Sequence, residues 1–152
     1  MTGLYRVVEG PLDPREAIDA ISGPDRGAIA TFLGVARDNH AGRRVLGIEY
    51  HAYPEMVEHV MAEIGREVAE SFGTPHTAIL HRIGVLAVGE TSVIVAVAAA
   101  HRREALAGCA HAIERLKALA PIWKKERYEE EDAAWIEGSE RVPPAAAGRT
   151  GR

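Results

Sequence analysis

The spacing of apolar and polar positions along the chain predicts three helices. Asp13 is a good N-cap, and the proline after it suits a first helical residue, so a helix is expected over 14–21. Over 54–72, apolar side chains recur at i, i+3, i+4 and i+7, with glutamates mostly on the opposite face. A third helix is expected from about 103 to 119, ended by Pro121.

Six further segments have the patterns of β-strands. The run 28–36 is almost continuously apolar, which is typical of a buried strand, whereas 45–52 alternates and indicates a half-buried one. The predicted strands are Leu4–Val8, Ala28–Ala36, Val45–Ala52, His76–Ile83, Thr91–Ala100 and Ala134–Glu137. Loops are expected at 37–44 and 122–128, and a short strand or turn at 84–90.

Strands and helices do not alternate strictly, which favours an α+β fold with a mixed or antiparallel sheet and about three helices. No linker or repeat divides the chain, so residues 1–142 are expected to form one domain and 143–152, rich in Pro, Ala and Gly, a flexible tail. A chain of 152 residues, 47% hydrophobic, has enough apolar material for one core without metal or disulfides.

Composition also bears on the cellular compartment. The single cysteine cannot form an internal disulfide, and the first ten residues lack the apolar run of a signal peptide. The longest apolar run, 93–100, is far shorter than the roughly 20 residues of a membrane span. A cytoplasmic protein without membrane segments is expected.

The net charge of −4 argues against a general nucleic-acid binder. It averages two unlike segments: 101–127 has seven basic and three acidic residues, or +4, whereas 128–140 has six acidic and no basic residues, or −6. All three lysines lie in the first segment, against 15 arginines in the whole chain. A composition bias that replaces Lys by Arg wherever only a positive charge is wanted explains this ratio. The three lysines are then either a chance remainder or positions that need an amine.

Lys117 lies among apolar positions of the third predicted helix. At 100° per residue, one stripe contains Leu106, Cys109, Ala110, Ile113, Leu116, Lys117 and Ala120. Either its alkyl chain packs while the ammonium reaches solvent, or the amine projects into an apolar pocket where it serves proton transfer or nucleophilic attack. Nearby cations favour the second interpretation and suit an anionic, phosphorylated substrate, although a solvated basic face would have the same composition.

Other chemistry has less support. Cys109, between small residues in mid-helix, has the pattern of a packed residue without an activating base. The seven histidines show no metal-ligand spacing beside a carboxylate, and the sequence has no CxxC, HExxH, GxSxG or phosphate-binding glycine loop. No metal site is expected.

Several short motifs together resemble one family. They are Phe32-Leu33-Gly34-Val35-Ala36-Arg37, Glu49-Tyr50-His51-Ala52-Tyr53-Pro54, His81-Arg82-Ile83-Gly84, Ala100-His101-Arg102, Leu116-Lys117 and Ala120-Pro121-Ile122-Trp123-Lys124-Lys125-Glu126. In this order, over roughly residues 4 to 140, the chain resembles the catalytic (large) subunit of molybdopterin synthase. The last two motifs are the most specific.

The resemblance implies an α/β-hammerhead fold and a sulfurtransferase of molybdenum cofactor biosynthesis, which converts cyclic pyranopterin monophosphate (precursor Z) to molybdopterin. The sulfur donor would be a small ubiquitin-like subunit with a C-terminal Gly-Gly thiocarboxylate. A heterotetramer built around a dimer of the large subunit is implied, and no cofactor of its own.

The resemblance also assigns two catalytic residues. Lys117 would lie beside the incoming thiocarboxylate as acid/base, and its amine could be acylated by the partner's tail. Lys124 would handle protons or the charge that develops as sulfur adds to the pterin side chain. A donor that arrives as a thiocarboxylate needs no reactive cysteine.

By the same resemblance, Arg37, His101 and Arg102 would hold the phosphate and pterin of the substrate, and Phe32 and Ile113 would line the channel for the partner's tail. One departure concerns the stretch after Glu137, from which the family can send an arginine into the neighbouring subunit. Here Gly138-Ser139 stands there, with Arg141 two residues later.

A different class of function is also compatible with these residues. A non-catalytic module could bind a ubiquitin-like C-terminal tail or a phosphorylated metabolite in the same basic pocket. Such a module would bind without turnover, so an activity assay separates the two.

Overall fold

The computed structural model describes residues 2–129 and 134–137, and the predicted tail 143–152 and Arg141 lie outside them. The helices are α1 (Pro14–Ile21), α2 (Pro54–Phe72) and α3 (Arg102–Leu119). The strands are β1 (Thr2–Glu9), β2 (Ala28–Val35), β3 (Asn39–His40), β4 (Arg43–Ala52), β5 (His76–Ala87), β6 (Thr91–Ala99), β7 (Ile122–Tyr128) and β8 (Ala134–Glu137). Among these residues, no helix is both long and apolar enough to cross a membrane.

The strands form a mostly antiparallel sheet in the order β2-β6-β5-β4-β7-β8, with β1 beside β5 and β3 beside β4. The pairing of β1 with β5 is parallel, so the predicted mixed sheet is confirmed. Strand β5 changes its antiparallel partner along its length: residues 76–81 pair with β6, and residues 84–87 pair with β4. Gly84, with φ of 96°, lies at the start of the second part, a conformation that favours glycine.

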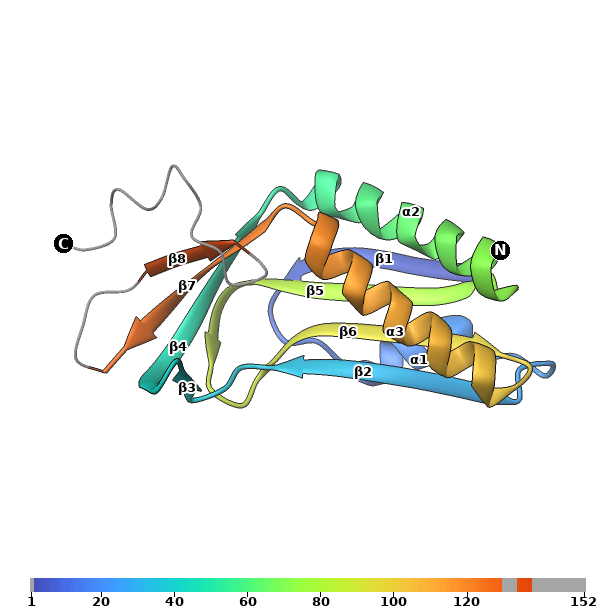
Figure 1. The fold of residues 1–152 in the computed structure, drawn as a ribbon, viewed down its shortest axis with the longest axis horizontal. Helices are drawn as coiled ribbons and strands as arrows, with labels where there is room; N and C mark the ends of the chain where they lie inside the picture. Colours follow the sequence, from blue (N-terminus) through green and yellow to red (C-terminus); the bar gives the residue numbers. More distant parts are fainter. Residues whose placement is uncertain (1, 130–133, 138–152) are drawn as a thin grey trace.

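Helices cover both faces of the larger part of the sheet (Figure 1). The main core lies between this sheet and helices α2 and α3, and contains Met61, Ile64, Ile79 and Val95. A second core lies under α1, around Ile21 and the side chains of β5 and β6 that face the other way. Strands β4, β7 and β8 extend beyond the helices, on the left of Figure 1.

The predicted loop at 122–128 is wrong, because this segment is strand β7, paired antiparallel with β4 and β8. Every second side chain of this strand is buried, namely Ile122, Lys124, Glu126 and Tyr128. Because two of these four are charged, the sequence does not show the apolar and polar alternation that is typical of a strand. The predicted loop at 37–44 is also partly wrong, since it contains β3 and the first residues of β4.

Strand β2 is not the buried strand that its apolar run predicts. It lies at the edge of the sheet, paired with β6 alone among the described strands. Ile29, Phe32, Leu33 and Val35 are between 37% and 49% exposed. An apolar edge strand has unpaired backbone groups and suits contact with another chain.

The buried face of α3 also differs from the predicted stripe. Small residues form it, because the helix packs closely on its neighbours: a methyl group on Gly108 would lie 3.1 Å from Val68 and 3.2 Å from Val97. Ala105, Ala112 and Leu116 are buried with it. Leu106 is 61% exposed, and Lys117 lies beside the buried face, exposed to solvent.

Candidate active site

A cavity of about 290 Å³ is lined by residues of β2, β4, β7 and the C-terminal part of α3. Four residues that the family resemblance assigns line it: Phe32 from β2, Arg37 from the loop after it, Lys117 from α3 and Lys124 from β7. The fold therefore brings both predicted catalytic lysines into one cavity, together with a predicted substrate-binding arginine and a predicted channel residue.

Lys124 is paired inside the cavity with a carboxylate, that of Glu126. The two residues lie two positions apart on β7, so their side chains are on the same face of the strand. Nζ of Lys124 is 3.6 Å from Oε2 of Glu126, and the two side chains are only 10% and 4% exposed. A buried charge loses its hydration, and an opposite charge nearby offsets part of that cost. Each of the two residues therefore stabilises the charge of the other in the interior.

Two further side chains contact the Glu126 carboxylate. The Tyr128 hydroxyl donates a hydrogen bond to its Oε1 over 2.5 Å, and Nδ1 of His40 lies 3.7 Å from its Oε2. The Arg43 guanidinium stacks on the Tyr128 ring, 3.6 Å from the ring centroid. These contacts tie the β3–β4 hairpin to the carboxylate that holds Lys124.

A smaller cavity of about 30 Å³ also reaches Lys117. Ile113, the second predicted channel residue, lines it with Tyr50 and Ser92, which also line the larger cavity. Burial raises the pKa of Tyr50, and a hydrogen bond with the Ser92 side chain opposes that rise. Tyr50 therefore remains a neutral phenol between the two cavities, paired in the strand register with Lys124.

His81 lies in the wall of the smaller cavity and is 6% exposed. Its ring meets that of Tyr50 edge to face, with centroids 5.1 Å apart and an interplanar angle of 76°. Burial lowers the pKa of His81 to about 4, and the Lys117 charge makes a smaller contribution in the same direction. A hydrogen bond to the Arg82 carbonyl opposes this shift. At neutral pH this imidazole is uncharged.

The low pKa of His81 predicts a pH dependence of stability. In the unfolded chain His81 binds a proton near pH 6.5, whereas in the folded chain it does so only near pH 4. The contribution of the neutral ring to the free energy of unfolding is therefore fully present above pH 6.5. It is lost as the pH falls from 6.5 toward 4, by about 3 kcal/mol in total. Denaturant unfolding across this range should show the loss, and a His81→Asn variant should bind about one proton fewer on unfolding. An unchanged pH slope in that variant would contradict the prediction.

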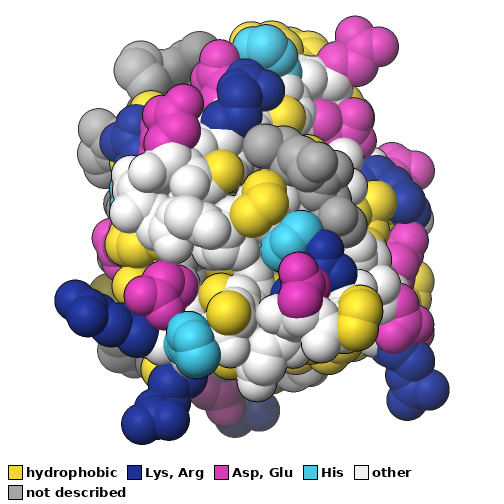
Figure 2. Space-filling model, turned by 90° about the vertical axis from the view of Figure 1, so that its right-hand side faces the viewer, with side chains coloured by type: hydrophobic (Ala, Val, Ile, Leu, Met, Phe, Trp, Pro, Cys, Tyr) yellow, Lys and Arg dark blue, Asp and Glu magenta, His cyan; other side chains and the backbone are white. Residues whose placement is uncertain are grey.

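His101 and Arg102 are not brought to these cavities within one chain. Arg102 begins α3 and Lys117 lies near its end, fifteen residues later, which is roughly 22 Å along the helix axis. Figure 2 shows the side of the molecule toward which the start of α3 points, where Lys and Arg are spread out with Asp and Glu between them. The basic segment 101–127 therefore does not form one patch.

A family model described as MoaE protein matches residues 7–119. The chain belongs to the MoaE family. The molybdopterin synthase catalytic subunit of Bacillus subtilis is 39% identical over 132 residues, which are 87% of this chain and 83% of the relative. Molybdopterin synthase from Staphylococcus aureus is similar in structure, with a TM-score of 0.82 and 36% identity over 86% of this chain and 95% of that one.

A second solved structure, from Helicobacter pylori, is a complex of subunits 1 and 2 of molybdopterin-converting factor. It shares the fold with a TM-score of 0.70 at 23% identity, over 91% of this chain and 92% of that one. The family matches confirm the resemblance found in the sequence motifs and the α+β fold expected with it. This MoaE chain is an enzyme, a molybdopterin synthase catalytic subunit of molybdenum cofactor biosynthesis.

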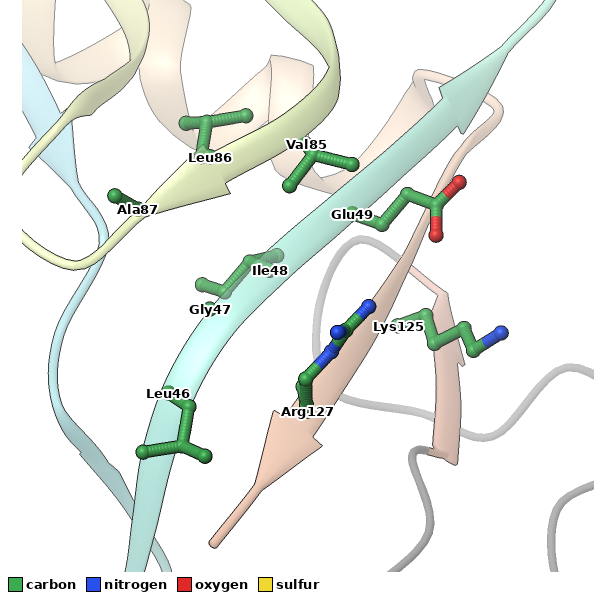
Figure 3. A pocket seen from close by; sticks show the side chains of 9 residues that line it. All are labelled: Leu46, Gly47, Ile48, Glu49, Val85, Leu86, Ala87, Lys125 and Arg127. Atoms are coloured by element: carbon green, nitrogen blue, oxygen red, sulfur yellow. The ribbon is translucent and has the colours of Figure 1, made fainter.

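Lys125 of this MoaE chain faces away from the two lysine cavities. It lines a separate cavity of about 220 Å³ on the other face of β4 and β7, with Glu49 and Arg127 beside it (Figure 3). Leu46 and Val85 form part of the apolar wall of that cavity. The alternation of β7 thus separates adjacent lysines, and only Lys124 joins Lys117.

Cys109 has the properties of a packing residue in this MoaE chain. It is 6% exposed, and burial raises the pKa of its thiol to about 11. Its Sγ lies 3.7 Å from the Val95 carbonyl oxygen. A thiol that is neutral and buried in this way is a poor nucleophile, as the sequence indicates. Within the described residues, no group of three or more His, Cys, Asp or Glu side chains could hold a metal ion.

Three further residues that line the two lysine cavities, Tyr50, His81 and Glu126, belong to the family motifs, but the sequence indicates no role for them. Glu126 follows Lys124 by two residues, so a strand over 122–128 would have placed both on one face. Tyr50 and His81 join the site through the pairing of β4 with β5 and β7, and their local sequence does not indicate it.

Proposed function

We propose that the larger cavity is where sulfur passes from the small subunit's thiocarboxylate to precursor Z, with Lys117 and Lys124 as the catalytic residues. The observation that carries the proposal is the convergence of both lysines and Arg37 in one cavity, from α3, β7 and the loop after β2. Lys117 serves as acid/base beside the thiocarboxylate. Lys124 stabilises the charge that develops on the pterin side chain.

The proposed sulfur donor is a small ubiquitin-like subunit whose C-terminal Gly-Gly enters the site past Phe32, which lines the larger cavity, and Ile113, which lines the smaller one. Two observations support such a partner. The edge strand β2 exposes the apolar side chains of Phe32 and Val35 in the lining of the larger cavity, where another protein could contact them. The related Helicobacter pylori structure is itself a complex of subunits 1 and 2.

The direct test is reconstitution. Purified protein mixed with precursor Z and thiocarboxylated small subunit is expected to form molybdopterin, detected as its fluorescent oxidation product. Binding of the small subunit without product would instead favour a non-catalytic module that captures the tail.

We further propose that His101 and Arg102 serve the site of a second copy in a dimer, as substrate-binding residues within a heterotetramer. Their distance from Lys117 along α3 supports this arrangement, because one precursor Z molecule cannot span it. In a dimer with C2 symmetry, if the start of α3 in one copy lies at the cavity of the second copy, the start of α3 in the second copy lies at the cavity of the first.

Mixed dimers test this exchange. Lys117→Ala and Arg102→Ala chains are unfolded, mixed in equal amounts and refolded. About half of the dimers then contain one chain of each kind, and each of these has one of its two sites intact. The mixture should therefore have about a quarter of the wild-type activity. Each variant alone should be nearly inactive. If Arg102 instead served the Lys117 of its own chain, the mixture would be as inactive as its components.

A further inference from the structure

The buried histidine of the smaller cavity has no role in the function proposed above. We propose that His81 is a positioning residue for Lys117, whose amine donates a hydrogen bond to Nε2 of the imidazole, directly or through one water. The inference deepens the proposed function and rests on the catalytic role of Lys117.

The tautomer of His81 follows from its backbone contact. Nδ1 lies 2.8 Å from the carbonyl oxygen of Arg82. A carbonyl oxygen only accepts hydrogen bonds, so Nδ1 carries the proton and Nε2 of the neutral ring is an acceptor. A lysine amine has only donors when charged, which makes the two groups complementary.

The surroundings hold this acceptor in place. The ring is 6% exposed and packs edge to face on Tyr50. A cavity of about 30 Å³ has room for about one or two water molecules, so the groups that line it lie close together. The Lys117 charge is close enough to act on the His81 ring.

The two lysines have partners of different kinds. Lys124 is paired with the buried carboxylate of Glu126. Among the described residues, the polar lining of the smaller cavity comprises Tyr50, His81, Ser92 and Lys117, with no carboxylate. A neutral acceptor orients the Lys117 amine without adding a negative charge. A carboxylate in the same place would repel the incoming thiocarboxylate, which is also negatively charged.

Two substitutions separate the ring nitrogens of His81. In His81→Gln the side-chain amide lies near the position of Nε2, whereas in His81→Asn it lies near Nδ1 and keeps the contact with the Arg82 carbonyl. We expect His81→Asn to lower kcat at least about tenfold with KM for the small subunit within about twofold, and His81→Gln to keep most of the rate. Equal rates in the two variants, or a larger loss in His81→Gln, would overturn the proposal.

A second measurement does not depend on turnover. Acetylation of Lys117 by an N-hydroxysuccinimide ester is followed by peptide mass spectrometry, with Lys125 on the opposite face as the reference in the same molecule. The ratio of Lys117 to Lys125 modification should change at least about threefold in His81→Asn and little in His81→Gln. If the ratio changes in His81→Asn but the wild-type protein forms no molybdopterin, the proposed function is refuted and the contact between His81 and Lys117 is supported. An unchanged ratio in a folded His81→Asn variant would refute the contact itself.

Discussion

Replacing Lys117 with alanine is expected to lower molybdopterin formation by about a hundredfold to ten-thousandfold, the usual range for loss of a general acid or base. The side chain is exposed, and water can replace its proposed hydrogen bond to His81, so the free energy of unfolding should change by less than about 1.5 kcal/mol. Single-turnover formation of molybdopterin from precursor Z and thiocarboxylated small subunit measures the rate, and thermal unfolding measures the fold.

Lys117→Arg is the matched control, because arginine keeps the positive charge but does not release its proton. If the amine acts as acid/base, the arginine variant should be nearly as slow as the alanine variant. Lys125→Ala, on the other face of β7, should retain the wild-type rate. A rate for Lys117→Ala within a few-fold of wild type would rule out the assigned role.

Glu126→Gln is expected to destabilise the fold by about 3 kcal/mol, since it leaves the Lys124 ammonium buried beside a neutral amide. The substitution keeps the shape of the side chain and an oxygen for the Tyr128 hydroxyl, so the lost charge dominates the effect. Urea unfolding at neutral pH measures the change. Turnover should also fall, because the same carboxylate positions Lys124.

The double variant Lys124→Met, Glu126→Gln separates stability from activity. Removing both charges should recover most of the lost free energy of unfolding, since a buried pair is often replaced by apolar groups at little cost. Activity should stay low, because the ammonium is gone. If the double variant is as unstable as Glu126→Gln alone, the ion pair is not the cause.

Local sequence signals predict the helices well. The Asp13 side chain accepts a hydrogen bond from the Arg15 amide over 2.9 Å, as an N-cap should, and the first helix has the predicted bounds. Gly73 ends α2 in the left-handed conformation, with φ of 71°. These signals act within a few residues, so the sequence alone contains them.

Features that depend on neighbouring strands were not predictable in this way. An apolar run such as 28–36 fits a central or an edge strand equally, and only the pairing order makes β2 an edge. Two charged residues of β7, Lys124 and Glu126, are buried in the lining of the larger cavity, and local patterns are least reliable at such candidate sites. The helical pattern alone indicates Lys117, whereas Lys124 is indicated only by the family motifs. The separation of Arg102 from Lys117 follows from helix length.

The parallel pairing of β1 with β5 affects how the chain folds. Thr2 is opposite His76, 74 residues later in the sequence, and the amide of Val7 donates a hydrogen bond to Glu58 of α2. Contacts over such separations require a large loop to close first, which slows folding. On the ribosome, the first strand to be synthesised therefore has to wait until β5 has emerged before it joins the sheet.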